Sequence, residues 1–427
     1  MNFSIFIVRR IASSKSHSFS SHIIRIAIAA VALSMCVMIV STSLIAGFQN
    51  EINKKIFGFW GHIQVTDSNI NRNFESVPID KNQPFYPYLD TIRSIKYVSS
   101  ESPDAIKSTT LGGIKHIQIF ANKPGIIKTK TAIEGILLKG VAADYDWTFL
   151  KSYLVKGRIL EAKKDANAVR DILISQQTSD RLNVTLNDKF IIFFVNGEAQ
   201  SKRVFQVCGI YKTGLEEYDR KIAITNIEET QNLLGWDSTK VGGFEIFLDD
   251  IRDLKPISEY IYLEKLPNHL YATTIREKFV NIFEWLDLQN INERVILSLM
   301  IFVAIINMIT ALLILILERT NMIGILKSLG ARNWTIRIIF VYQAAYILII
   351  GLFWGNLIGC SLCWLQDKFR LVKLPEADYY LSYAPVSMNF SQIVLLNAVT
   401  LFLTVLFLLI PSWLVTRISP VKAIQFK

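Results

Sequence analysis

The stretch Ile26–Ala46, IAIAAVALSMCVMIVSTSLIA, contains no charged side chain. A helix needs about 20 apolar residues to cross the hydrocarbon core of a bilayer, so this stretch is long enough to span a membrane. Three further uncharged stretches occur in the second half of the chain, at Val295–Leu317, Ile338–Gln366 and around Ile393–Leu414. The sequence therefore predicts a membrane protein with four transmembrane helices.

The formal net charge of +10 is confined to three segments beside these stretches, which together hold 11 lysines and arginines and one glutamate. Such short basic segments stay in the cytoplasm, and their position also argues against a nucleic-acid-binding surface. The expected organisation is a cytoplasmic N-terminus (1–25), transmembrane helices at 26–46, 295–317, 338–366 and 391–414, a large external segment (47–294), a cytoplasmic loop (318–337), a second external loop (367–390) and a cytoplasmic C-terminus (415–427).

The external segment is predicted to be an α+β domain, because short β-branched or alternating runs are separated by glycine, proline and polar residues. We expect a hairpin between Phe190–Val195 and Arg203–Val207, because Asn196-Gly197 is a favoured turn pair, with Glu198–Lys202 lengthening or bulging it. Ile52 and Ile56 repeat at helical spacing, so the first helix should continue into this domain. The expected strands are His62–Thr66, His116–Phe120, Asp171–Ile174, Lys189–Val195, Val204–Ile210, Lys221–Thr225 and Phe244–Leu248, with a short helix at Ile227–Leu234.

No pattern in the sequence indicates covalent chemistry. There is no Gly-x-x-x-x-Gly-Lys-Ser/Thr phosphate loop, and the five histidines are scattered without metal-ligand spacing. We therefore predict that the chain is not an enzyme and has neither catalytic residues nor a metal site.

The inner loop contains a predicted amphipathic helix. Met322, Ile325, Leu326 and Leu329 share one helical face, and Gly330 is a preferred helix stop. This helix either docks on a partner protein or lies on the membrane surface, and the two interpretations are equally supported by the residues.

The third predicted span carries a stripe of glycines at Gly351, Gly355 and Gly359. Glycines four residues apart allow two helices to approach closely. The contact is either within the four-helix set or between two copies of the chain.

Several of these residues also resemble a known family. Glu318-Arg319-x-x-x-Ile323-Gly324-Ile325-Leu326-Lys327-x-Leu329-Gly330-Ala331, followed by the glycine stripe and by Pro420-Val421-Lys422-Ala423-Ile424, is similar to the permease domain of type VII ABC systems. That superfamily includes FtsX-type, MacB-type and LolC/LolE-type permeases. One span, an external domain and three further spans match its topology.

The external half is similar to the lipoprotein-releasing LolC/LolE branch. Gly47-Phe48-Gln49-x-Glu51-Ile52 resembles the exit of its first span, and Gly135-Ile136-x-Leu138-x-Gly140-Val141 resembles a second motif. A third motif is matched by Phe205-x-Val207-x-Gly209-Ile210-Tyr211-x-Thr213-Gly214-x-x-Glu217-Tyr218-Asp219. FtsX-type permeases usually have a smaller external domain, and MacB-type permeases usually carry a fused ATPase.

The resemblance implies an inner-membrane permease that extracts lipoproteins and passes them to a periplasmic carrier. It would bind no cofactor directly, because a separate ABC ATPase subunit would bind ATP and Mg²⁺. Its partners would be that ATPase, a second permease subunit in a homo- or heterodimer, a lipoprotein, membrane lipids and a carrier. The alternatives are an FtsX-like signalling permease that controls a cell-wall hydrolase and a MacB-like efflux permease.

The implied site residues fall in three groups. Carrier docking in LolC-type proteins uses a long hook, whereas this chain offers only the hairpin residues Asn196, Gly197, Lys202 and Arg203. The residues of the proposed acyl-chain site could equally well be explained by ordinary packing of helices against one another. The ATPase-coupling residues would be Glu318, Arg319, Met322, Gly324, Leu326, Lys327 and Gly330, and the acyl-chain site would be Ile45, Phe48, Ile52, Ile56, Trp285 and Leu288.

Overall fold

The structure, a computed structural model, describes residues 19–69, 75–98, 107–128, 133–161, 170–196 and 199–417. The chain forms two compact units. The helical unit comprises Met1–Asn50, Trp285–Lys373 and Tyr383–Lys427, and the sheet unit comprises Glu51–Glu284 and Leu374–Ser382. The turn residue Gly197, most of the N-terminal segment 1–25 and the C-terminal motif at Pro420 lie outside the described residues.

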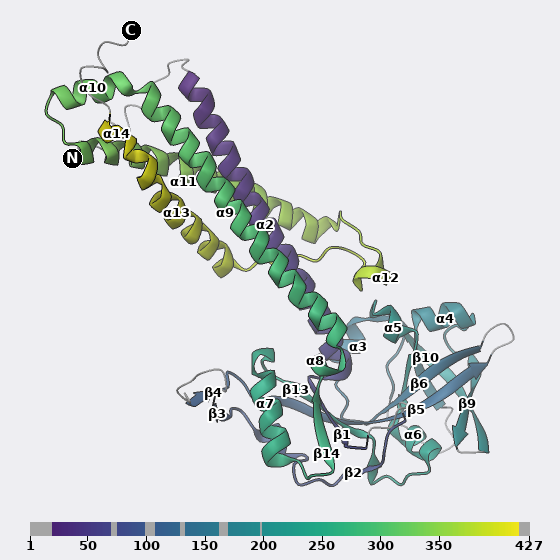
Figure 1. The fold of residues 1–427 in the computed structure, drawn as a ribbon. Helices are drawn as coiled ribbons and strands as arrows, with labels where there is room; N and C mark the ends of the chain where they lie inside the picture. Colours follow the sequence, from purple (N-terminus) through teal and green to yellow (C-terminus); the bar gives the residue numbers. More distant parts are fainter. Residues whose placement is uncertain are drawn as a thin grey trace. The chain divides into compact units, whose positions relative to one another are not determined.

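Four helices in the described residues are long and apolar enough to cross a membrane (Figure 1). Their buried side chains, such as Val31, Met35, Leu312 and Phe340, form one apolar core. The first helix runs well past Ala46, as the repeat of Ile52 and Ile56 predicts. The four helices are α2 (Phe19–Trp60), α9 (Val280–Glu318), α11 (Asn333–Phe369) and α13 (Phe390–Ser412), with the short helices α10 (Thr320–Ser328) and α14 (Leu414–Arg417) beside them.

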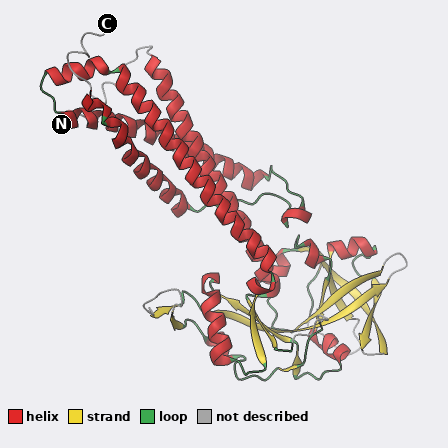
Figure 2. Ribbon diagram, viewed as in Figure 1, coloured by secondary structure: helices red, strands yellow, loops and turns green. Residues whose placement is uncertain are grey.

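The sheet unit contains a 10-stranded mixed sheet with short helices around it (Figure 2). The strand order is β14-β1-β13-β5-β6-β11-β8-β10-β7, and β9 pairs with both β10 and β5. The strands are β1 (Ile63–Asp67), β5 (Ile114–Lys128), β6 (Ile133–Val141), β7 (Leu154–Gly157), β8 (Arg170–Ser175), β9 (Lys189–Asn196), β10 (Ala199–Tyr211), β11 (Ile222–Asn226), β13 (Gly243–Leu248) and β14 (Leu270–Thr274).

Two small strand pairs and a set of short helices complete the sheet unit. The pairs are β2 (Ile79–Asp80) with β12 (Lys240–Val241) and β3 (Lys96–Val98) with β4 (Lys107–Thr109). The helices are α3 (Thr148–Ser152), α4 (Gln176–Leu182), α5 (Glu216–Asp219), α6 (Ile227–Leu234), α7 (Leu254–Tyr260), α8 (Ile275–Lys278) and α12 (Glu376–Tyr379), with single turns at Tyr88–Thr91, Ile251–Asp253 and Ile261–Lys265.

The expected α+β domain is confirmed, since each of the seven predicted strands overlaps an observed one and α6 has the predicted bounds. The Asn226 side chain caps the start of α6, and Gly235 ends it with a φ of 71°. The strand β6 was not among the predicted strands. A Cβ atom at Gly140 would lie 2.4 Å from the Thr230 hydroxyl oxygen of α6, so a glycine is needed where strand and helix touch.

Candidate functional site: the inner helix and the stalk

The inner helix α10 ends in a well-formed C-terminal cap. Gly330 has a φ of 84°, a conformation that glycine adopts without steric cost. The amide of Ala331 donates to the carbonyl oxygen of Leu326 (N···O 3.0 Å), and the amide of Gly330 donates to that of Lys327 (3.0 Å). These two bonds are the Schellman pattern, which explains why the helix stops at the predicted glycine.

The predicted apolar face of α10 is split in the structure. Ile323, which the sequence analysis left off this face, is fully buried, and Met322 and Leu326 pack partly against the same helical core. Ile325 and Leu329 instead point outward, with exposed fractions of 55% and 79%. Met322 and Leu326 therefore lie at the edge of the buried side, and docking of the predicted face on a partner stays a prediction. Adjacent apolar residues made two faces possible, and packing against the helical core selects the one centred on Ile323.

The remaining coupling residues hold α10 in place or flank it. The Lys327 ammonium donates to the carbonyl oxygens of Val415 (2.8 Å) and Thr416 (3.2 Å), and both residues belong to α14. Burial lowers the pKa of Lys327. Gly324 is a buried residue of α10, while Glu318 is exposed at the end of α9 and Arg319 is half-buried just before α10. Lys327 is thus a structural contact within the chain.

In the helical unit, α2 and α9 lie side by side (Figure 1). The rings of Phe48 and Trp285 meet edge to face, with their centroids 6.4 Å apart. The Gln49 amide nitrogen donates to the side-chain oxygen of Asn290 (2.6 Å). An aromatic contact and a side-chain hydrogen bond therefore join the two helices at this level.

The residues predicted for acyl-chain binding are divided between the two units. Ile52 and Ile56 are buried in the sheet unit, whereas Ile45, Phe48 and Trp285 are half-buried in the helical unit. Helical spacing along α2 reflects core packing here, which is the alternative that the sequence left open. Leu288 is exposed and belongs to a different set of residues on α9.

That set forms an apolar stripe along the outer face of α9. Its members recur at intervals of three or four residues, the spacing of a single helix face. All are more than two-fifths exposed, and they are Leu288, Ile291, Val295, Leu299, Phe302 and Ile306. We call this set the α9 stripe. It offers a lipid tail or a second helix an open apolar surface.

The glycine stripe packs within the chain. A Cβ atom at Gly351 would lie 2.8 Å from the Val31 side chain, and one at Gly355 would lie 2.6 Å from Met35. At Gly359 the nearest atom would be 3.2 Å away, in Ile39. Each glycine therefore faces α2 of the same chain, and the bare stripe lets α11 approach α2 closely.

The predicted carrier-docking hairpin is longer and more regular than expected. Pairing between β9 and β10 is unbroken from Lys189↔Gln206 to Asn196↔Ala199. Of the two expected alternatives, Ala199–Lys202 lengthen the hairpin by pairing with β9 and do not bulge it. Lys202 is exposed and Arg203 is half-buried, and neither lies in a hook within the described residues.

A buried charge cluster lies in the sheet unit and was missed by the sequence analysis. The Lys139 ammonium contacts both carboxylate oxygens of Glu245 (2.8 and 3.0 Å), and these two side chains are 1% and 0% exposed. Gln64 and Gln118 donate their amides to the same carboxylate at 3.0 and 2.9 Å. The Lys278 ammonium donates to the side-chain oxygen of Gln64 (2.7 Å). The carboxylate thus contacts Lys139 directly and is linked to Lys278 through Gln64.

The cluster lies beside the end of α2 and just before the start of α9, and we call these two helices the stalk. The Lys139 ammonium also donates to the Phe59 carbonyl oxygen (3.0 Å) near the end of α2. The Lys278 ammonium lies 4.8 Å from the ring centroid of Trp60, and α9 begins two residues after Lys278. Burial lowers the pKa of Lys278 to about 8. No sequence pattern predicts this cluster, because its members come from four strands and a short helix.

The Thr213–Asp219 motif builds a turn beside these helix ends. The Asp219 carboxylate accepts from the amides of Thr213 and Gly214 (both 3.0 Å) and from the Thr213 hydroxyl (2.6 Å). Burial raises the pKa of Asp219 despite these bonds. The ring of Tyr218 meets those of Trp60 and Phe279 edge to face. The motif is therefore structural, and it supports the point where the stalk joins the sheet.

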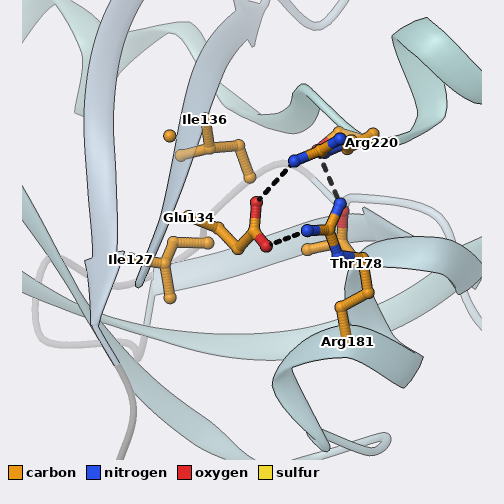
Figure 3. A pocket seen from close by; sticks show the side chains of 7 residues that line it. Ile127, Glu134, Ile136, Thr178, Arg181 and Arg220 are labelled. Atoms are coloured by element: carbon orange, nitrogen blue, oxygen red, sulfur yellow. Dashed lines mark hydrogen bonds and ion pairs between the residues drawn. The ribbon is translucent and has the colours of Figure 1, made fainter. Parts of the chain in front are cut away.

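Figure 3 shows a neighbouring group of charges, in which Glu134 points between Arg181 and Arg220. Glu134 pairs with the Arg181 guanidinium and lies 3.7 Å from that of Arg220. These ion pairs fill the space between β6, α4 and α5. They join the strand that carries the second family motif to the segment that carries the third.

Comparison with known proteins adds the family relationship. The family "FtsX-like permease C-terminal" matches residues 294–420. The lipoprotein-releasing system transmembrane protein LolC of Xylella fastidiosa is 22% identical over 98% of this chain and 98% of its own length. LolC of Buchnera aphidicola subsp. Schizaphis graminum is 24% identical over 96% of the chain and 94% of that protein.

A LolE protein is also similar. The lipoprotein-releasing system transmembrane protein LolE of Haemophilus influenzae is 20% identical over 92% of each chain. The LolC and LolE matches therefore include both the helical unit and the sheet unit, and the FtsX-like match covers the helices that follow the sheet unit. Along nearly its whole length the chain is therefore similar to ABC permeases of the LolC/LolE type.

Proposed function

We propose that the protein is the inner-membrane permease subunit of an ABC complex that extracts lipoproteins from the membrane and passes them to a periplasmic carrier. The observation that supports this most strongly is the similarity to LolC and LolE proteins along nearly the whole chain. The chain is not itself enzymatic in this proposal. A separate ABC ATPase subunit binds ATP and Mg²⁺, and a second permease subunit completes the membrane part.

Both termini and α10 lie in the cytoplasm in this proposal. The basic segments beside the four apolar helices support this orientation. Ile325 and Leu329 then project from α10 toward the ATPase, while Ile323 and Lys327 fasten α10 to the permease. A helix held on one face and apolar on the other can pass movement of the ATPase to α9 and α11.

The α9 stripe is the proposed surface for lipid chains of the substrate. Each buried methylene contributes about 0.8 kcal/mol, so three acyl chains hold a lipoprotein in the bilayer with a free energy on the order of tens of kcal/mol. Extraction therefore needs coupling to ATP. A carrier that binds this chain would meet the exposed side of the β9–β10 hairpin, where Lys202 and Val204 lie.

Photocrosslinking from the α9 stripe tests the proposal. A photoreactive amino acid at Ile291 should capture a lipidated protein, and the adduct should disappear when the same protein lacks its lipid or when ATP and the ATPase are added. The matched control places the probe at Ile52, which is buried and should give no adduct.

The similarity of residues 294–420 to FtsX-like permeases makes a signalling role the main alternative. A signalling permease would show no lipid-dependent adduct at Ile291 in an intact, active complex, and its crosslinks would concentrate on the sheet unit. That result would contradict the extraction proposal.

A further inference from the structure

A groove runs between α2 and α11 on the helical unit, away from the residues assigned to coupling and to substrate. It encloses about 650 Å³, which is within the range of ligand-binding cavities. Arg25, Ala29 and Leu33 line it from α2, and Ile350, Trp354 and Ile358 line it from α11.

The local sequence explains why the groove exists. The glycine stripe brings α11 onto α2, and the small exposed side chain of Ala29 leaves space just outside that contact. The partly exposed side chains of Trp354 and Ile358 form the opposite wall. Ala29 and Leu33 are four residues apart on α2, as are Ile350 and Trp354 on α11, so each helix presents one continuous face to the groove.

The charge of the groove is one-sided. Arg25 lies at the N-terminal end of the α2 wall and is the one charged residue in the lining. It is exposed and forms no hydrogen bond or ion pair with another described residue. The α2 wall continues to Cys36, eleven residues further on, so the groove follows the helix for about 16 Å. This length is about half the hydrocarbon thickness of a bilayer, the depth of a single leaflet.

We propose that this groove binds one anionic phospholipid, with its phosphate at Arg25 and one acyl chain along Ala29, Leu33 and Trp354. An arginine offers a phosphate two parallel hydrogen bonds, and the rest of the lining suits a hydrocarbon chain. The lining has no acidic residue to attract the amine of a zwitterionic head group. The site is independent of lipoprotein release, so either proposal can fail alone.

Native mass spectrometry of the full-length protein tests the site. The protein would be equilibrated in detergent with equal amounts of phosphatidylglycerol and phosphatidylethanolamine. The wild type should retain one phosphatidylglycerol, and R25Q should reduce its retention about fivefold, as expected for one basic residue near an anionic head group. R25K should keep the preference. R294Q, which removes an exposed arginine from α9, should change nothing. Equal retention by R25Q and wild type, or an equal loss in R294Q, would overturn the proposal.

A second readout uses Trp354 and does not depend on Arg25. Brominated phosphatidylglycerol should quench the wild-type protein more than the W354F variant, and A29F should abolish that difference by filling the groove. If A29F is quenched like the wild type, the lipid lies elsewhere. If A29F changes the oligomeric mass but not lipid retention, the groove is a protein contact and the lipid proposal is wrong.

Discussion

At the scale of single residues, the cluster around Glu245 buries an ion pair inside the sheet unit. Lys139 and two glutamine amides contact one carboxylate that has no access to water, and Lys278 donates to one of these glutamines. Burying charges is costly, so such a cluster is stable only when every member keeps its partners. Lys139 and Lys278 contact Phe59 and Trp60, so the loss of a partner in the cluster would also disturb the end of α2.

Replacing Glu245 with alanine should lower the free energy of unfolding by about 3–5 kcal/mol, because the buried Lys139 ammonium loses its counter-charge. R252A removes an ion pair from an arginine that is 72% exposed, and it should leave the free energy of unfolding almost unchanged. Denaturant unfolding of the full-length protein in detergent, followed by tryptophan fluorescence, measures both. Similar costs for the two variants would show that the cluster is not tightly coupled.

Lys278 should make stability depend on pH. Burial lowers its pKa from 10.5 to about 8 in the folded protein, so between these values the unfolded chain binds the proton more tightly. The free energy of unfolding should therefore rise as pH increases from about 8 to 10.5, and because the Lys278 side chain is exposed, solvent screening keeps this rise small. The K278M variant should lack this rise. An identical rise in K278M would assign it to another group.

At the scale of elements, only some features of α10 could be predicted from the sequence. Its position and its stop at Gly330 follow from local rules, whereas its buried face does not, because Ile323 and Ile325 are both apolar and only packing selects between them. The same holds for the stalk, where Ile52 and Ile56 repeat correctly but turn inward. Long apolar helices and α6 were predictable from periodicity. The Lys139–Glu245 pair was not, because strand pairing brings together residues far apart in the chain.

The double variant I325D/L329D should reduce ATPase stimulation in the assembled complex to the basal level. Two carboxylates would then lie on the exposed face of α10, where we expect apolar contact with the ATPase. N321D adds one charge at another exposed position of α10 and should keep stimulation close to wild type. Full stimulation in the double variant, with normal assembly, would mean that α10 does not couple the two subunits.

At the scale of the whole molecule, the charge distribution predicts the orientation that the proposed function needs. A cysteine replacing Lys202 should react with a membrane-impermeant thiol reagent added to intact spheroplasts. A cysteine replacing the exposed Asn333 should react only after lysis. Both variants are best made with the four native cysteines replaced. The reverse labelling pattern would place the sheet unit in the cytoplasm and exclude lipoprotein delivery to the periplasm.

The central claim is that this permease helps to remove lipid-anchored proteins from a membrane. The most direct measurement is release of a triacylated protein from proteoliposomes that contain the permease, its partner subunits and the ATPase. We predict release that requires ATP and is lost with I291D, which places a charge in the α9 stripe. A protein held by a transmembrane helix should stay behind. If ATP is hydrolysed at a normal rate and no lipidated protein leaves the liposomes, even with a carrier present, the account is contradicted.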